Sequence, residues 1–268
     1  MCIPEQDSPV WRRLFHAGES GTPWWAHTAN AVAALLLISA FFYYCLRQVG
    51  YEWNWGPVWV YRQKFVTGWL VTIGISAAAL LTSTFIGVAT ALIRRSRILI
   101  LHHAGTIYVE LIRSTPLLVQ ILIFFYVIAN AAGVQNRYVA GVAILSLFAG
   151  AYISEIVRSG IENIAESQLE SARAIGLSEA QTYRYVIFPQ AIRQVLPPLT
   201  GQFVSLIKDS SLLSIIAIEE FTLNAQEVNA NTYSGLESYL PLAAGYLLLT
   251  LPLSLWTRRL EHRFRYAT

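Results

Sequence analysis

The chain has 268 residues, of which 55% are hydrophobic and 13% are charged, and its mean hydropathy is +0.46. This charge content is far below that of an ordinary soluble domain, which argues against a water-soluble enzyme. The net charge of +3 is too small to predict nucleic-acid binding. The only two cysteines, Cys2 and Cys45, offer neither a disulfide framework nor metal-ligand spacing.

Six apolar stretches approach or exceed the length of about 20 residues that a helix needs to cross a hydrocarbon core. Only one of them is interrupted by charges, at Lys208 and Asp209, and the stretches cover 28–46, 65–93, 114–136, 138–154, 194–218 and 238–257. They are apolar on all sides instead of alternating, which excludes membrane-spanning strands. The predicted fold class is therefore an all-α integral membrane protein with six transmembrane helices.

Arginines gather after the second stretch, after the fourth stretch and at the C-terminal end, and cytoplasmic segments carry such an excess. The segment 219–237 holds four glutamates and no Lys or Arg, which suits the outer face. Alternation then places both termini in the cytoplasm. This orientation leaves Arg47, Arg62 and Lys64 outside, against the usual cytoplasmic excess of basic residues.

These assignments divide the chain into five regions. The first 27 residues do not have the pattern of a short cleavable signal peptide and are predicted to form a cytoplasmic tail. An extra transmembrane helix follows at 28–49, and then an extracytoplasmic loop at 50–65. The main transmembrane domain is predicted at 66–257, with a polar excursion at about 158–190, and 258–268 form the second cytoplasmic tail.

The second stretch carries small residues at every fourth position, which lets another helix approach closely: Ala79, Ser83, Gly87 and Ala91. An interfacial or bent helix is predicted at 98–112, leading into the third stretch at Pro116. Glu110 and Arg113 are expected to pair there, three residues apart on one face. The adjacent His102 and His103 would point in different directions, so no metal site is predicted.

The longest polar interruption, 155–194, carries two sets of helix boundary signals. The pattern from Ser167 to Glu170 is a capping box that opens a helix, and Gly176 is placed to end it in a left-handed conformation. A second capping box begins at Ser178, and Pro189 is expected to end the second helix. The segment therefore predicts a cytoplasmic helix-turn-helix, here called the knob, with the shape of a docking element.

The knob carries a resemblance. Glu170-Ser171-Ala172, then Gly176, then Val-Ile-Phe-Pro at 186–189 resemble the EAA loop of ABC importer permeases, whose pattern is Glu-Ala-Ala, three residues, Gly, nine residues and Ile-x-Leu-Pro. Four further motifs resemble the polar amino acid uptake branch of that family: YVELIRSTPLLVQ at 108–120, GAYISEIVR at 150–158, FPQA at 188–191 and KDSSL at 208–212. The resemblance covers about residues 66–265, so the first helix lies outside the five-helix core that it implies.

The resemblance implies a type I ABC importer permease in a bacterial inner membrane, forming the translocation path for a polar amino acid. Its implied partners are a second permease subunit, identical or paralogous, two ABC ATPase subunits and an extracytoplasmic substrate-binding protein, besides membrane lipid. The chain lacks the Gly-x4-Gly-Lys-Ser/Thr loop that cradles phosphates, so ATP and magnesium would bind to the ATPases, and this chain is expected to hold no cofactor or catalytic residue. Glu170, Ala172, Gly176 and Pro189 would couple ATPase closure to the spans.

Other interpretations remain open at this point. The same motifs suit a permease for another small solute, such as an opine, a sulfur amino acid or an amino-acid derivative. A secondary transporter or channel would not need the knob, whereas a membrane scaffold without transport could keep it.

Three polar residues within the predicted spans are candidates for the translocation path. Lys208 lies about 21 Å along its span at 1.5 Å per residue, and ionisable groups there usually face a cavity or each other. Lys208 and Asp209 either line the substrate path or mark a helix break at a packed joint, and the two interpretations are equally supported. Gln120 is a weaker candidate, because a buried amide often only bonds neighbouring helices.

Overall fold

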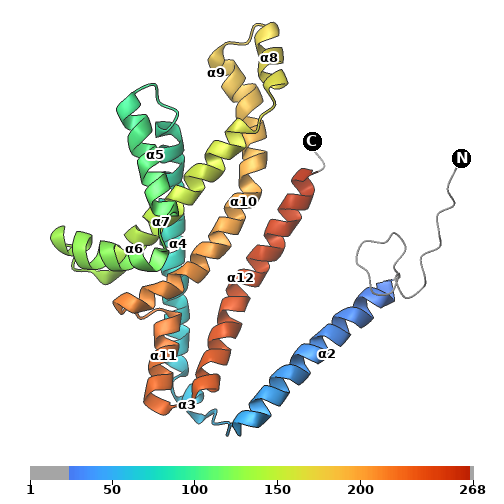
Figure 1. The fold of residues 1–268 in the computed structure, drawn as a ribbon, viewed down its shortest axis with the longest axis vertical. Helices are drawn as coiled ribbons and strands as arrows, with labels where there is room; N and C mark the ends of the chain where they lie inside the picture. Colours follow the sequence, from blue (N-terminus) through green and yellow to red (C-terminus); the bar gives the residue numbers. More distant parts are fainter. Residues whose placement is uncertain (1–23, 266–268) are drawn as a thin grey trace, which may run out of the picture. The chain divides into compact units, whose positions relative to one another are not determined.

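The computed structural model describes residues 24–265, which are helical apart from short connections and contain no strand. Three short stretches depart from α-helical geometry, the π-helical η1 (Phe124–Ala129) and η2 (Tyr183–Ile187) and the 3-10 helical η3 (Ser210–Ile216). The α-helices, labelled in Figure 1, are α2 Trp24–Val49, α3 Gly56–Val60, α4 Arg62–Ile93, α5 Leu99–Arg113, α6 Leu117–Ile123, α7 Arg137–Glu162, α8 Glu166–Ala174, α9 Glu179–Thr182, α10 Phe188–Asp209, α11 Phe221–Thr232 and α12 Gly235–Arg265.

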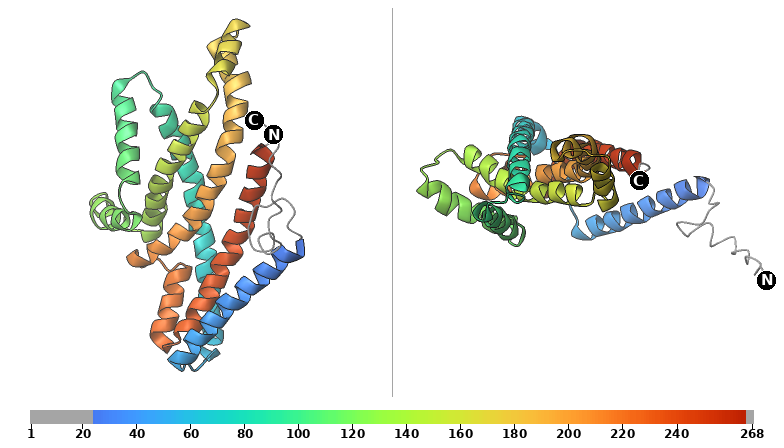
Figure 2. Two further views of the ribbon diagram at one scale, coloured as in Figure 1. Left: turned by 45° about the vertical axis from the view of Figure 1, so that its right-hand side comes forward. Right: turned by 90° about the horizontal axis from the view of Figure 1, so that it is seen from above.

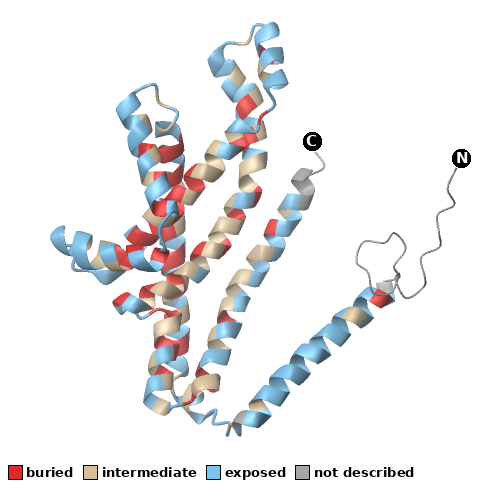
Figure 3. Ribbon diagram, viewed as in Figure 1, coloured by how far each residue is buried: buried red, intermediate tan, exposed pale blue. Residues whose placement is uncertain are grey.

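The chain divides into two compact units, and the first, which ends at Trp53, contains α2. This helix of 26 residues agrees with the predicted extra helix at 28–49, but it begins at Trp24, inside the predicted tail. The rest of that tail, 1–23, lies outside the described residues. Every side chain from Ala31 to Cys45 is exposed (Figure 3), so α2 presents apolar surface on all sides, as lipid contact requires.

The second unit, Asn54–Thr268, contains the other described helices. By length and apolar composition, α4, α7 and α12 can each cross a membrane, as can α2. Two further spans exist only as bent pairs, so the described residues give four straight spans, or the predicted six if each bent pair counts as one. Figure 2 shows α8 and α9 projecting from one end of this unit and α11 at the opposite end. Helix α12 continues through the predicted C-terminal tail as far as Arg265.

The third predicted span is not a single helix. The chain bends by 112° between α5 and the helical segment Leu117–Ala129, which confirms the bent helix before Pro116. Pro116 has an extended ψ of 137° and is the N-cap of α6. α5 ends at Arg113, just before it, because a proline disfavours helical geometry in the residue that precedes it. The expected stretch 114–136 also ends early, since Asn136 already caps α7 by accepting hydrogen bonds from the Tyr138 and Val139 backbone N–H groups.

The small-residue stripe of α4 packs against α7, as predicted. Ala79 and Ser83 are completely buried, and Gly87 and Ala91 are also buried. A Cβ atom on Gly87 would lie 2.5 Å from Ile153 Cγ2 and 2.9 Å from the Gly150 carbonyl oxygen. The two backbones are therefore in close approach at this crossing, and only a residue without a side chain fits.

We predict that Gly87→Ala destabilises the protein by about 1–3 kcal/mol, because the added methyl group overpacks the α4–α7 crossing against backbone that cannot move away. The measurement is the thermal unfolding midpoint of the purified protein in detergent. The matched control is Gly74→Ala on the same helix, where a Cβ would meet nothing within 4 Å. An equal midpoint for the two variants would contradict the close approach.

Candidate functional site

The knob is built by α8, a tight turn and α9, and the turn is a complete helix C-cap. Gly176 has φ +79°, the left-handed conformation that the sequence predicts. The Gly176 N–H donates to the Arg173 carbonyl oxygen and the Leu177 N–H donates to the Ala172 carbonyl oxygen, both at 3.0 Å. This is the Schellman arrangement, in which two hydrogen bonds close the end of the helix. The turn is therefore held by backbone bonds that depend on a left-handed residue.

One of the two predicted capping boxes exists. Ser178 caps α9 by accepting from the Gln181 N–H, and the Gln181 side chain accepts from the Ser178 N–H. The box predicted at Ser167 is wrong, because the N-cap of α8 is Ala165, two residues earlier, and it makes no side-chain hydrogen bond. Glu166 stands in the first turn of α8 instead, where its negative charge favours the helix N-terminus.

The prediction that Pro189 ends the second helix is also wrong. α9, η2, α10 and η3 form one continuous helical run from Glu179 to Ile216. Pro189 occupies the first turn of α10, immediately after the π-helical stretch η2. A wider π-helical turn shifts the hydrogen-bond pattern, so that the missing N–H and the ring of a proline can be accommodated. The knob is thus continuous with a membrane-spanning helix.

Of the other predicted coupling residues, two are exposed and one is buried. Glu170 is exposed on α8 and Gly176 is exposed at the turn, so both are available to a partner. Ala172 is only 2% exposed and packs inside the knob. Its burial makes it a packing residue of the knob and not a surface contact.

The three predicted path residues are not brought together. Gln120 is buried, and its Nε2 donates to the Ile112 carbonyl oxygen at 2.7 Å and to two oxygens of Thr115 at 2.8 and 3.0 Å. It therefore holds the bend between α5 and α6. Lys208 and Asp209 lie at the end of α10, where the helix narrows into η3 without interruption. The predicted helix break does not fall at these residues, because the run ends only at Ile216 and the chain then bends by 49° into α11. Lys208 is exposed and Asp209 is half-buried, and neither side chain forms an ion pair or hydrogen bond within residues 24–265.

The expected pair of Glu110 and Arg113 is absent from the described residues, where Glu110 is exposed. Arg113 instead lies 3.8 Å from Glu155 and places its guanidinium over the Tyr152 ring. Glu155 also pairs with Arg94 at 2.9 Å and with Arg158. This cluster ties the ends of α4 and α5 to α7, because the Glu155 carboxylate on α7 offers several acceptor sites to the arginines around it.

The segment 219–237, predicted only as an acidic outer segment, contains the most buried carboxylates of the described chain. Glu220 is 0% exposed and caps α11, accepting from the Thr222 and Leu223 N–H groups at 2.8 Å each. The Tyr246 hydroxyl on α12 donates to Glu220 at 3.1 Å, and Thr72 on α4 donates at 3.5 Å. Glu220 therefore joins three helices, a role that the spacing of charges along the sequence does not reveal.

A second buried carboxylate and an ion pair lie, like Glu220, at the α11 end of the second unit. Glu237 is 1% exposed and accepts from the Asn54 N–H. Glu227 on α11 pairs with Lys64 on α4. This pairing gives Lys64, one of the cations that the predicted orientation leaves outside, an acidic partner on the same face.

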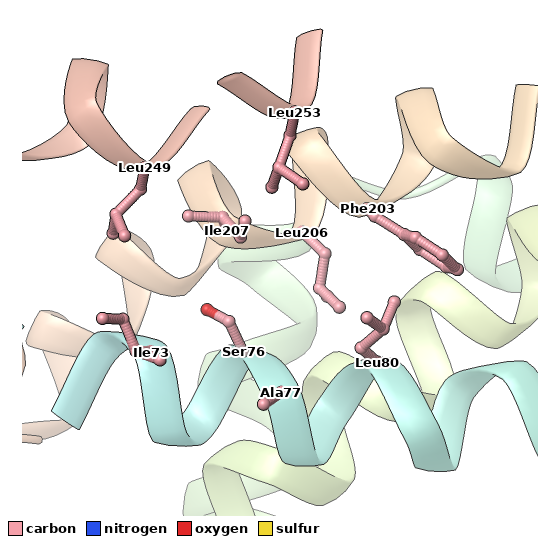
Figure 4. Close-up of a pocket in the computed structure, with 9 residues that line it drawn as sticks. All are labelled: Ile73, Ser76, Ala77, Leu80, Phe203, Leu206, Ile207, Leu249 and Leu253. Carbon is pink, nitrogen blue, oxygen red and sulfur yellow. The ribbon is translucent and has the colours of Figure 1, made fainter. Parts of the chain in front are cut away.

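An apolar cavity of about 260 Å³ lies between α4, α10 and α12. Figure 4 shows Ile73, Ser76 and Leu80 on α4 pointing toward Leu206 and Ile207 on α10, with Leu249 and Leu253 of α12 above them. Ser76 is the only polar side chain in the lining, and its hydroxyl has no hydrogen-bond partner within the described residues. Such a lining suits a hydrocarbon chain and does not suit a charged solute.

Comparisons with known proteins identify a family of membrane transport components and several similar permease proteins. The model of the family described as "binding-protein-dependent transport system inner membrane component" matches residues 83–266. The chain is 36% identical over 199 residues to a probable glutamine ABC transporter permease protein of Bacillus subtilis, covering 74% of this chain and 92% of that protein. It is 34% identical over 216 residues to the glutamine transport system permease protein of Escherichia coli, covering 80% and 99%. A crystal structure of an amino acid ABC transporter with histidines superposes with a TM-score of 0.74 at 33% identity, covering 80% of this chain and all of that chain.

Proposed function

Because the chain belongs to the family of binding-protein-dependent transport system inner membrane components, we propose that it forms the translocation path of an ATP-driven importer for a polar amino acid. The observation that carries this proposal is the identity to two glutamine permease proteins over 92% and 99% of their lengths. Glutamine is therefore the first solute to test. The protein is a multi-pass component of the inner membrane, and we place both termini and the knob in the cytoplasm.

The proposed assembly contains a second permease subunit, two ATPase subunits and an extracytoplasmic substrate-binding protein. ATP and magnesium act on the ATPases, so this chain contributes no catalytic group. Its own contribution is the knob, where exposed Glu170 and the turn at Gly176 meet an ATPase. Since the knob is continuous with α10, a movement of the docked ATPase reaches the membrane without passing through a flexible loop.

Among the path candidates, Lys208 and Asp209 are better supported than Gln120. The amide nitrogen of Gln120 already has three hydrogen-bond acceptors within the chain. The side chains of Lys208 and Asp209 form no hydrogen bond or ion pair among residues 24–265. Together they offer one positive and one negative group. Such a pair matches the carboxylate and ammonium groups of an amino acid.

The experiment is uptake of labelled amide, acidic, basic and sulfur amino acids in cells that lack the gene and in cells complemented with the wild-type gene. We expect loss of uptake for one class, with glutamine the first candidate, and recovery with the gene. Cells carrying an empty vector are the control for the complementation. Unchanged uptake across the whole panel would contradict the amino-acid assignment and would leave the family membership intact.

A further inference from the structure

A polar pocket of about 430 Å³ lies between the knob and the connection from α4 to α5. Three arginines line it, Arg95 and Arg97 from the connection and Arg173 from α8. Glu179, Thr182 and Tyr183 contribute from the helical run that follows the turn, and leucine and isoleucine side chains form the remaining walls. The pocket therefore gathers cations from two segments that are distant in the sequence.

The positive charge of this pocket is not neutralised by the described residues. Arg95 donates to the Tyr183 hydroxyl at 3.0 Å, a neutral partner. Arg97 and Arg173 have no carboxylate within ion-pair distance among residues 24–265, and Glu179, the one acidic side chain in the lining, pairs with neither. Arg94, by contrast, is bound to Glu155. The pocket thus keeps an excess of guanidinium groups, each of which can present two parallel N–H donors to an anion.

Apolar and aromatic side chains beside the pocket are exposed, which is typical of a surface that faces a membrane. The apolar side chains directly after Arg97 are open, with Ile98, Leu99 and Ile100 exposed by 58, 72 and 76%. On the other side of the pocket, Tyr183 and Tyr185 are also exposed, and aromatic residues of this kind favour the headgroup level. Arginines beside such side chains suit the level of the polar headgroups.

We propose that this pocket binds the phosphodiester headgroup of an anionic phospholipid. The guanidinium groups of Arg97 and Arg173 receive the phosphate, and the acyl chains lie along the exposed side chains at the start of α5. Basic pockets between helices on the cytoplasmic side of a membrane suit such headgroups. One lipid would then bridge the knob and the α4–α5 connection, two parts that the described chain joins directly through Arg95 and Tyr183.

The test is native mass spectrometry of the purified full chain, titrated with phosphatidylglycerol or with phosphatidylcholine of the same acyl chains. We expect one tightly retained phosphatidylglycerol, and about 30-fold weaker binding for Arg97→Gln/Arg173→Gln, since each cation near the surface contributes about fivefold. The matched control is Arg258→Gln/Arg259→Gln, which removes two exposed cations from α12 and is expected to keep the tight site. Circular dichroism checks that each variant keeps its helix content, and Arg97→Lys/Arg173→Lys keeps the charge if the glutamine variant does not fold.

Three results would overturn the proposal. The first is equal retention of the two lipids by the wild type. The second is displacement of phosphatidylglycerol by the same concentration of inorganic phosphate or glycerophosphoglycerol, which would make the ligand a free phosphate. The third is unchanged lipid binding together with loss of ATPase-subunit association in Arg97→Gln/Arg173→Gln, which would make the pocket a protein contact. Because lipid retention is measured without transport, failure of this proposal is distinguishable from failure of the proposed function.

Discussion

Gly176→Val is expected to lower uptake by about tenfold or more while the helix content of the protein stays unchanged. Gly176 has φ +79°, and a β-branched residue in this conformation costs about 1–2 kcal/mol. The turn also depends on two backbone hydrogen bonds, from Gly176 and Leu177, which are lost if the chain leaves the left-handed region. The penalty falls on the knob and not on the packed helices, since a Cβ at Gly176 would meet nothing within 4 Å. The measurement is labelled uptake together with ATP hydrolysis by the assembled complex.

The matched control for this variant is Gly133→Val. Gly133 has φ +70° and an equally open Cβ position, but it lies in the connection between η1 and α7. It carries the same backbone strain without touching the knob. Gly176→Asn is a second comparison, expected to keep most of the uptake because asparagine tolerates the left-handed conformation. Wild-type uptake by Gly176→Val, or an equal loss in Gly133→Val, would contradict a coupling role for the turn.

Glu220→Ala is expected to destabilise the protein by about 3 kcal/mol, which lowers the thermal unfolding midpoint by about 8 °C for a chain of this size. The carboxylate accepts hydrogen bonds from two backbone N–H groups and from the Tyr246 hydroxyl, and it is completely buried. Removing it leaves the two backbone N–H groups without their side-chain acceptor, and a buried polar group without a partner costs about 1–3 kcal/mol. The midpoint is measured on the purified protein in detergent.

The neighbouring glutamate provides the control. Glu219 carries the same charge but is exposed, so Glu219→Ala is expected to leave the midpoint nearly unchanged. Glu220→Gln keeps one acceptor oxygen and nearly the same shape, and its midpoint is expected to fall between those of the wild type and Glu220→Ala. If Glu219→Ala and Glu220→Ala unfold at the same temperature, the buried network contributes nothing measurable.

The sequence predicts the knob well because the signals of its turn are local. The turn at Gly176 and the capping box at Ser178 are held by hydrogen bonds between residues at most five positions apart, so their effect can be read along the chain. Pro189 shows the limit of such reading. Its effect depends on the π-helical stretch before it, whose widened turn keeps the helix continuous across a residue that normally ends one.

The buried carboxylates were missed for a different reason. A glutamate in a segment without lysine or arginine is typical of the water-exposed outer face, and the spacing of the glutamates along 219–237 also fits an exposed turn. Glu220 is buried because Thr72 and Tyr246, nearly 150 and 26 residues away, converge on it in the folded protein. Likewise, Arg113 forms its ion pair with Glu155 on α7 and not with Glu110 on α5, its own helix. Partners this distant cannot be read from the local pattern.

The continuous helix that follows the knob is long enough to convert a small tilt at the knob into a large displacement at its far end. From Glu179 to Asp209 it covers a length of about 45 Å at 1.5 Å per residue. A tilt of about 5° pivoting at the knob would carry the far end sideways by about 4 Å, which is close to the width of a small amino acid side chain. That far end is the joint at Lys208 and Asp209, where the helix tightens into η3 before the chain turns by 49° into α11. A rotation too small to disturb the packing near the knob is thus magnified into a displacement that can open or close a passage.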